Sequence, residues 1–345
     1  MIRGPLTRDE VIAAVERTGG KRIPVLFHKW WGEGLEERYG ASLEAMATPY
    51  PDDIFTAWYE EPGAETSPNQ NPHYRLGYRD DYSDAERHSI GRAAVLLPDW
   101  SELDRFLEDF PDPHEPGIFD SVQTETERSA GGRYKLGCWW RLFHERLWTI
   151  RGMENLMLDY YDAMDELKII GRKILEFDKV IVDRFAALGF DGIFTSDDLG
   201  HQTGPMMSPA VFEELYYPLY EEFIDYVHQK GMHVFLHSCG DNTLLMPYLI
   251  STGLDVFHPV QKGCMDMEET ARRFGNQISF LAGMDVQNIL PNGTPAEVRE
   301  EIRYLKRTFH SEQGGLILAA GNGILSDTPL ENIEAMLDEM CNETL

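Results

Sequence analysis

Short β-rich runs alternate with amphipathic helical stretches along most of this chain, and this alternation constrains its fold more than any other feature. We predict eight strands, at 22–27, 53–57, 134–138, 192–195, 233–237, 255–259, 278–283 and 315–319. From the fourth strand onward, single helices separate the strands, for example over 208–230 and 294–310. Such connections demand right-handed crossovers between parallel strands. Eight of these strands in this length predict one α/β domain over residues 1–345, a (β/α)8 TIM barrel.

Three of the predicted helices begin with the spacing of a capping box, in which a threonine and a glutamate three residues later satisfy each other's backbone N–H groups. Proline follows the threonine in two of them, at the first helical position. The three pairs are Thr7 with Glu10, Thr294 with Glu297, and Thr328 with Glu331. We therefore expect helices to start at all three places.

One segment does not fit the alternation. The stretch from Glu60 to Asp112 is rich in Pro, Asn, Gly and Asp, and it is too long for an ordinary connection. It follows the second strand, and loops that follow the strands of a barrel share one face. We therefore expect an irregular excursion over the C-terminal mouth of the barrel.

The composition excludes several classes of partner. The formal net charge is -28, from 59 acidic and 31 basic residues, which repels nucleic acid and anionic membrane surfaces. No apolar stretch is long enough to span a bilayer, and the N-terminus lacks the apolar region of a signal peptide. Four scattered cysteines do not form a disulfide framework. These features predict a cytoplasmic protein that acts on a small molecule, and they indicate no oligomeric state.

Polar and aromatic side chains follow seven of the eight predicted strands. In a barrel of this kind, the catalytic groups come from the C-terminal ends of different strands. We therefore expect these residues to ring one mouth: His28 and Trp30, Trp139 and Trp140, Asp197 and Asp198, His237 and Cys239, Gln261, Asp285, and Asn322.

Within this ring, His237 and Cys239 form the most specific pair. Residues i and i+2 of an extended chain point to the same side, so the imidazole and the thiol can face one point and supply half of a zinc site. The alternative is a buried cysteine beside a hydrogen-bonded histidine. Asp197 and Asp198 are catalytic candidates, as a general base or as a carboxylate that orients a histidine. Alternatively, one of them caps the loop before Gly200.

Other candidates concern the substrate. Tryptophans after the first and third strands, Trp30 and Trp139 among them, suit a flat-walled pocket for an apolar or cationic group such as a methyl ether or a quaternary amine. The alternative is ordinary core filling. Arg151 either holds a substrate carboxylate, forms a buried pair with Glu154, or lies on a helix surface.

Several of these runs together resemble one family. Ser196 to Gly200, Gly231 to Gly240, Gly253 to Asp255, and Gly321-Asn322 followed by Thr328 to Ile333 are similar to the uroporphyrinogen decarboxylase superfamily, and more narrowly to its corrinoid-dependent methyltransferase branch. The resemblance covers about 191–337 well and the first half loosely. It implies the same single barrel.

The resemblance also implies a cofactor and a partner. In that branch the His and Cys of a His-x-Cys element bind zinc, and a second Cys near the last strand completes the protein ligands. His237 and Cys239 match the first element, whereas the second position falls on Asn322, whose amide replaces thiolate poorly. Cys264 is the nearby thiol that would substitute. The implied function is methyl transfer between a small methylated substrate or thiol acceptor and a corrinoid held by a separate protein.

Two other functions remain open from the sequence. The tetrapyrrole decarboxylases of the superfamily carry an arginine-rich segment after the first strand, and this chain reads Phe27 to Gly32 there without either arginine. The absence of these arginines makes tetrapyrrole decarboxylation the weaker interpretation. A lyase that acts on a carboxylated substrate without metal remains the first alternative. A non-catalytic ligand-binding relative is the second, because the third zinc ligand of the family is absent at Asn322.

Overall fold

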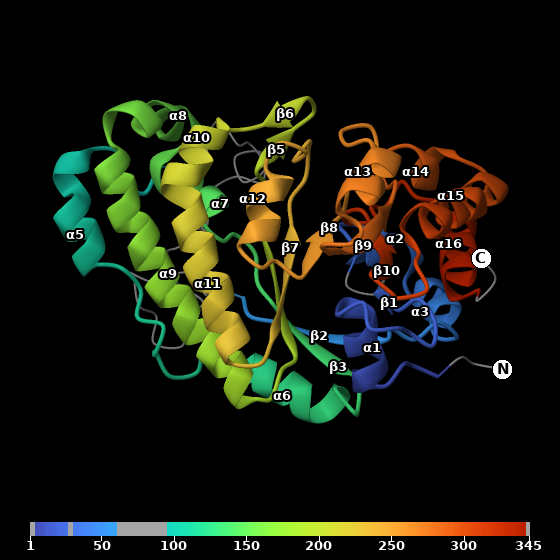
Figure 1. Cartoon of the computed structure of the whole chain (residues 1–345). Coiled ribbons are helices and arrows are strands. Elements are labelled where there is room, and N and C mark those ends of the chain that lie inside the picture. The colour runs from blue at the N-terminus through green and yellow to red at the C-terminus, as the bar shows by residue number, and fades with distance from the viewer. Residues whose placement is uncertain (1–3, 27–29, 61–94, 343–345) are drawn as a thin grey trace.

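A computed structural model describes residues 4–26, 30–60 and 95–342 of the chain. His28, which we expected at the mouth, lies outside the described residues, as does most of the expected excursion (61–94). Eight parallel strands form the centre of the molecule (Figure 1). They are β1 (Val25–Leu26), β2 (Ile54–Trp58), β3 (Tyr134–Cys138), β4 (Gly192–Ser196), β7 (His233–His237), β8 (Val256–His258), β9 (Ser279–Met284) and β10 (Leu316–Ala320).

The strands run in the order β1-β10-β9-β8-β7-β4-β3-β2, so consecutive strands in the chain are neighbours in space. The sheet nearly closes on itself. Between β1 and β2, the backbone N–H of Asp53 donates to the Val25 carbonyl at 3.1 Å, and the Asp53 carboxylate accepts the Val25 N–H at 2.9 Å. Arg22 pairs with the same buried carboxylate. This confirms the predicted TIM-barrel fold, and each predicted strand lies within three residues of its observed bounds.

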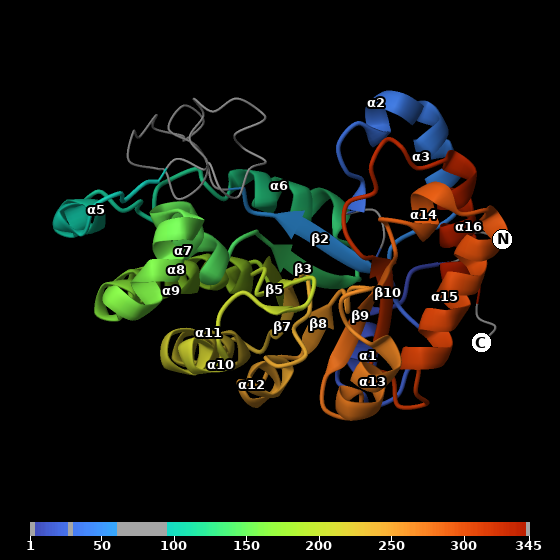
Figure 2. The same cartoon turned by 90° about the horizontal axis from the view of Figure 1, so that it is seen from above.

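Helices surround the barrel (Figure 2). They are α1 (Arg8–Val15), α2 (Leu35–Tyr39), α3 (Ala41–Ala47), α5 (Leu103–Glu108), α6 (Asp120–Ser129), α7 (His144–Arg151), α8 (Met153–Asp162), α9 (Met164–Ala187), α10 (Pro209–Val211), α11 (Tyr217–Gln229), α12 (Met246–Ser251), α13 (Met267–Phe274), α14 (Ile289–Asn292), α15 (Pro295–Phe309) and α16 (Leu330–Cys341). A π-helical turn, Phe212–Tyr216, joins α10 to α11, and a short hairpin of β5 (Gly200–His201) and β6 (Gly204–Pro205) follows β4. None of the described helices is long and apolar enough to cross a membrane.

Two of the three predicted capping boxes form. Thr7 and Glu10 satisfy each other's backbone N–H groups at the start of α1, and Thr294 and Glu297 do so at α15. At the third place a helix does start, since α16 begins at Leu330, but the predicted capping box does not form, because Pro329 is the N-cap and there is no side-chain cap. Thr328 is buried, and its carbonyl accepts a hydrogen bond from Tyr39.

The later part of the expected excursion, residues 95–112, packs against outer helices. Trp100 Nε1 donates to Asp159 of α8 at 3.0 Å, and Phe110 meets Phe177 of α9 edge to face at 6.0 Å. Figure 2 shows α5 at the far side of α9, away from the strands. Cover over the mouth is therefore not provided by residues 95–112.

Candidate active site at the C-terminal mouth

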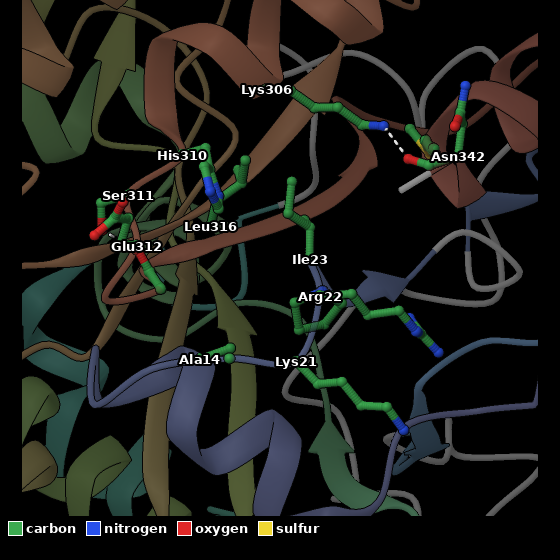
Figure 3. Close-up of a pocket in the computed structure, with 14 residues that line it drawn as sticks. Ala14, Lys21, Arg22, Ile23, Lys306, His310, Ser311, Glu312, Leu316 and Asn342 are labelled. Carbon is green, nitrogen blue, oxygen red and sulfur yellow. Dashed lines mark hydrogen bonds between the residues drawn. The ribbon is translucent and has the colours of Figure 1, made fainter. Parts of the chain in front are cut away.

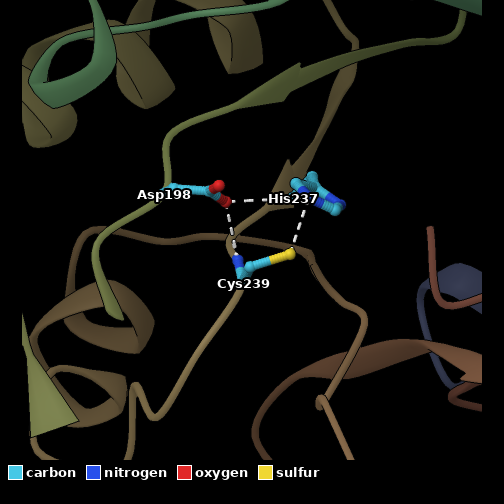
Figure 4. Close-up of side chains that lie close together, drawn as sticks. All are labelled: Asp198, His237 and Cys239. Atoms are coloured by element: carbon cyan, nitrogen blue, oxygen red, sulfur yellow. Dashed lines mark hydrogen bonds and ion pairs between the residues drawn. The ribbon is translucent and has the colours of Figure 1, made fainter. Parts of the chain in front are cut away.

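Three different donor groups meet where β4 and β7 end. Asp198 follows β4, His237 is the last residue of β7, and Cys239 lies two residues further on. One oxygen, one nitrogen and the sulfur of these residues all lie within 4.8 Å of one another (Figure 4). His237 Nε2 lies 3.3 Å from Cys239 Sγ and 3.7 Å from Asp198 Oδ1. The side chains of His237 and Cys239 thus converge, as the i, i+2 spacing predicts.

A second histidine determines which nitrogen of His237 carries the proton. His258 Nε2 lies 3.0 Å from the carbonyl oxygen of Ala320, which can only accept, so His258 Nε2 donates. In a neutral imidazole the other nitrogen then accepts, and His258 Nδ1 lies 2.7 Å from His237 Nδ1. His237 therefore donates from Nδ1 and keeps a lone pair on Nε2. That lone pair faces Cys239, as a metal ligand requires.

The loops after β4 and β7 are fixed to each other at this point. Asp198 Oδ1 accepts the backbone N–H of Cys239 at 2.8 Å. Gly240 adopts a φ of +82°, and a Cβ there would lie closer than 3.0 Å to the backbone of Gly200. Only glycine permits this close approach. The His-Ser-Cys-Gly sequence is thus explained locally, because its glycine lets the thiol loop lie against the loop that carries Asp198.

The surroundings of Cys239 hold its thiol in the protonated form. Burial raises the pKa of the thiol above its usual range, and the Asp198 carboxylate adds to the rise. The amide of Asn322 opposes it, since Nδ2 lies 3.6 Å from Sγ and Oδ1 is held by the Gly323 N–H at 2.7 Å. A divalent cation among the three donors would reverse this balance and favour the thiolate.

The donor set fits one class of metal. Zinc accepts carboxylate oxygen, imidazole nitrogen and thiolate sulfur, whereas magnesium and calcium prefer oxygen throughout. The third donor at this site is Asp198, in addition to the expected His237 and Cys239. Cys264 does not belong to this cluster of histidine, cysteine and carboxylate donors among the described residues. Asn322 faces Cys239 Sγ with its amide nitrogen, which is a donor, while its amide oxygen accepts the Gly323 N–H.

Asp197 has a different role from the catalytic one that we expected. Its fully buried carboxylate accepts the backbone N–H groups of Phe143, His144 and Glu145 at 2.7–3.1 Å. It also accepts the Tyr220 hydroxyl at 2.6 Å. These donors occupy it at the N-terminus of α7, where a carboxylate is favoured by the helix dipole. Burial nevertheless raises the pKa of Asp197 to about 6. Asp197 is a helix-capping residue that positions its neighbour Asp198.

Sequence reasoning missed two residues near the cluster. Glu145, in the first turn of α7, accepts a hydrogen bond from Ser196, and burial with the nearby carboxylates of Asp198 and Asp197 raises its pKa to about 8. A carboxyl group that keeps its proton at neutral pH is typical of functional sites. The second missed residue is His258. The sequence could have identified it, because it is a polar residue at the end of an apolar strand.

The tryptophans divide between the core and the mouth. Trp139 is buried between the sheet and the helices, where it stacks on Phe185 of α9, so our expectation that it lines the pocket was wrong. Trp30 is also buried, but it stacks on His258 at 4.6 Å and so supports the histidine pair. Trp140 is 39% exposed, and its ring centroid lies 5.6 Å from that of His237. The ring of Trp58 lies beside that of Trp140, with 4.9 Å between the centroids. Trp58 and Trp140 form the aromatic side of the mouth.

Arg151 does not reach the mouth. Its guanidinium forms a buried ion pair with Asp159 at 2.6 Å, donates to the Leu97 carbonyl and lies over the Trp100 ring. The buried-pair alternative thus describes it, with Asp159 in place of Glu154. The substrate-binding expectation for Arg151 was wrong because its donors are taken up within the helix layer.

A cavity of about 200 Å³ opens beside Cys239, and no tryptophan is among its described lining residues. The residues Gln261, Asp285 and Asn322, which we expected in the ring of polar residues at the mouth, all line it. Cys264 and Lys262 line it as well. The Gln261 side chain accepts the Gly240 N–H at 2.7 Å, which ties the cavity wall to the thiol loop.

A larger cavity of about 360 Å³ lies at the opposite end of the barrel, between the starts of β1 and β10 (Figure 3). Its buried cations are already paired. Lys306 donates to the carbonyl of Asn342 at 2.5 Å, and Arg22 pairs with Asp53 at 2.6 Å. In barrels of this kind this end serves stability rather than catalysis.

A known protein family matches the half of the chain that carries the cluster. The family model described as "Uroporphyrinogen decarboxylase (URO-D)" matches residues 148–342. Over 130 residues the chain is 32% identical to "Methylated-thiol--coenzyme M methyltransferase" of Methanosarcina mazei, which covers 36% of this chain and 33% of that relative. Over 127 residues it is 26% identical to "Methylcobamide:CoM methyltransferase MtbA" of Methanosarcina acetivorans. This match covers 37% of this chain and 35% of that relative. The chain thus spans about a third of the length of these relatives.

A solved structure described as "methyltransferase from Methanosarcina mazei" has the same fold. It superposes with a TM-score of 0.62 over 97% of this chain and 98% of that chain, at 15% sequence identity. At that identity the likeness confirms the architecture alone.

Proposed function

We propose that this chain, which belongs to the uroporphyrinogen decarboxylase family, is a methyltransferase. It moves a methyl group between a small methylated substrate or thiol acceptor and the cobalt of a corrinoid carried by a separate protein. One observation carries the proposal: Asp198, His237 and Cys239 present an oxygen, a nitrogen and a sulfur donor to one point at the catalytic end of the barrel. The two named methyltransferases, matched over part of their length, support the same reaction class.

Zinc is the metal that the donors fit. It would be held by the Asp198 carboxylate, His237 Nε2 and Cys239 Sγ, and it would supply a Lewis acid that keeps a bound thiol ionised or polarises a methyl donor. With three ligands from the protein, such a zinc would still be able to bind one substrate atom, as in catalytic zinc sites.

The chain's own residues prepare this site. His258 accepts from His237 Nδ1 and so keeps Nε2 ready to ligate. Asp198 holds the backbone of Cys239, which fixes the direction of the thiol. Glu145 carries its proton at neutral pH and can exchange it with a group at the mouth.

The two sides of the cluster suit two reactants. On one side, Trp58 and Trp140 present flat apolar surface near His237, which suits the face of a methyl-carrying group. On the other side, the 200 Å³ cavity beside Cys239 has room for a small substrate. We place the enzyme in the cytoplasm, where its four free cysteines would stay reduced.

A methyl-transfer assay tests this function. The protein is supplied with zinc, methylcobalamin in place of the corrinoid protein, and a small thiol, and demethylation of the cobalamin is followed by absorption while the thioether is identified by mass spectrometry. We expect turnover by the wild type, a loss of turnover in Cys239→Ser, and little change in Cys341→Ser, which replaces a free cysteine at the end of α16. Absence of transfer, together with decarboxylation of a tetrapyrrole or another carboxylated substrate by the same protein, would favour the lyase alternative.

A further inference from the structure

We propose that the cavity beside Cys239 is the acceptor-thiol subsite and that it selects an acceptor with a cationic or uncharged tail. Asp285 is the anchoring residue for that tail. The inference rests on the proposed methyl transfer and adds the charge class of the acceptor. An acceptor with an anionic tail is the ligand that this cavity should disfavour.

The position of the cavity assigns it to the sulfur acceptor. Cys239 lies in its wall, so a thiol that enters it reaches the donor cluster directly. Asn322 and Gln261 line the same space from the loops after β10 and β8. A volume of about 200 Å³ falls below the roughly 300–1,000 Å³ of sites for drug-sized ligands. The acceptor is therefore a short molecule of few heavy atoms.

The described charges around the cavity favour a cation. Lys262 is the cationic side chain among the lining residues that the structure describes, apart from the ionisable ring of His201, and its ammonium is paired with Glu301. Asp285 uses Oδ1 to accept the backbone N–H groups of Gln287 and Asn288, at 2.9 and 3.1 Å. Both bonds fall on one oxygen, so Oδ2 remains available to a ligand that donates.

Two further carboxylates belong to the loops that form the cavity wall, although they do not line the cavity. Asp198 accepts the Cys239 N–H at 2.8 Å. Asp241 directly follows Gly240 of the wall and accepts the Thr243 N–H at 2.9 Å. Among the described lining residues, an anionic tail would meet the Asp285 carboxylate and a lysine that is already paired with Glu301. An ammonium or hydroxyl tail would instead find an acceptor in Asp285.

The test uses three thiols that share a two-carbon chain and differ only in the terminal group: 2-aminoethanethiol, 2-mercaptoethanol and 2-mercaptoethanesulfonate. Their dissociation constants for the zinc-loaded protein are measured by calorimetry without any methyl donor. We expect 2-aminoethanethiol to bind tightest and the sulfonate weakest. The S-methyl thioethers of all three, which cannot ionise at sulfur, control for the different acidities of the thiols.

The variant Asp285→Asn assigns the effect to one side chain. It should weaken 2-aminoethanethiol about fivefold, the value of a good ion pair at a partly exposed site, and leave 2-mercaptoethanol little changed. Glu154→Gln, which removes an exposed carboxylate on α8, should change none of the three constants. A tightest constant for the sulfonate, no binding of any of the three, or an unchanged series in Asp285→Asn would each overturn the inference.

This outcome is separable from that of the proposed function. If the amine series binds as expected but no thiol is methylated from methylcobalamin, the subsite stands and methyl transfer is refuted. If the sulfonate binds best and is methylated, methyl transfer stands and the charge class is refuted.

Discussion

Asn322 illustrates how much of this site depends on single side chains. It occupies the position where the methyltransferase branch was expected to supply a second thiolate, yet its amide nitrogen lies 3.6 Å from Cys239 Sγ. It therefore contacts this sulfur as a hydrogen-bond donor. Asp198 provides the third donor from a different strand.

This arrangement predicts that Asn322→Cys tightens zinc binding. A thiolate at this distance adds a fourth, softer ligand to the three donors, so the affinity measured by competition with a chromogenic chelator should rise about tenfold or more, equivalent to ~1.4 kcal/mol. Asn322→Ser serves as the control, because it removes the amide and adds no thiolate. Equal affinity in the cysteine and serine variants would contradict the geometry.

The His237–His258 contact predicts a second effect on the metal. His258→Phe removes the acceptor of the His237 Nδ1 proton, and loss of such an outer partner typically lowers metal affinity about 10- to 100-fold. His258→Gln keeps an acceptor and should recover part of the loss. The nitrogen shifts of His237 in the metal-free protein, measured by NMR, should show protonation at Nδ1 in the wild type. Protonation at Nε2 would contradict our assignment.

At the scale of elements, the loops after β4 and β7 work as one unit. The backbone of Gly240 lies against that of Gly200, at a positive φ. Gly231, at the start of the turn into β7, has a similar φ of +74° but open space around its missing Cβ. Substitution of either glycine by alanine therefore strains the backbone, but only substitution of Gly240 also creates a steric clash.

We predict that Gly240→Ala abolishes zinc binding and lowers the free energy of unfolding by about 1–3 kcal/mol more than Gly231→Ala does. Both variants carry the roughly 1–2 kcal/mol cost of a left-handed alanine, but only the first pushes two loops apart. Urea unfolding and metal content of the two proteins measure the difference. Equal unfolding free energies with zinc retained in both would show that the loops can separate freely.

A pair outside the mouth predicts a pH effect on stability. His228, in the last turn of α11, is hydrogen-bonded to Asp255 at 2.8 Å, and this bond raises its pKa from the ordinary 6.5. Because the folded pKa lies above the unfolded one, the contribution is complete below about pH 6.5 and is lost as the pH rises through the folded pKa. His228→Gln should therefore lower the free energy of unfolding at pH 5.5, by about 1 kcal/mol or less.

At pH 8.5 the same variant should match the wild type more closely, and exposed His114→Gln should show no such trend. A deficit for His228→Gln that is constant across this range would mean that the histidine acts through packing alone.

The sequence specified the elements well for a physical reason. Parallel barrel strands are buried on both faces, so they read as short apolar runs bounded by turn residues, and all eight appear close to their predicted bounds. The capping boxes at Thr7 and Thr294 follow from local spacing and formed. The box at Thr328 failed because tertiary contacts bury that residue and the helix starts beyond Pro329.

At the scale of the whole molecule, the barrel brings together residues from distant parts of the chain. Glu145, Asp198, His237, His258 and Asn322 belong to five different strands or the segments that follow them, and the strand order places the ends of these strands at one mouth. The pairing of His237 with Cys239 was predictable because it is local. The donor role of Asp198, the orienting role of His258 and the core position of Trp139 were not, since each depends on how one segment packs against another.

Our central claim is that Asp198, His237 and Cys239 form one zinc site at the barrel mouth. The most direct test is the zinc content, by plasma mass spectrometry, of protein purified without chelators. We predict one zinc per chain in the wild type and in Cys264→Ser, and little or none in Asp198→Ala, His237→Ala and Cys239→Ser, whose circular dichroism should match the wild type. A wild type without zinc, or full zinc content in both Asp198→Ala and Cys239→Ser, would contradict the account.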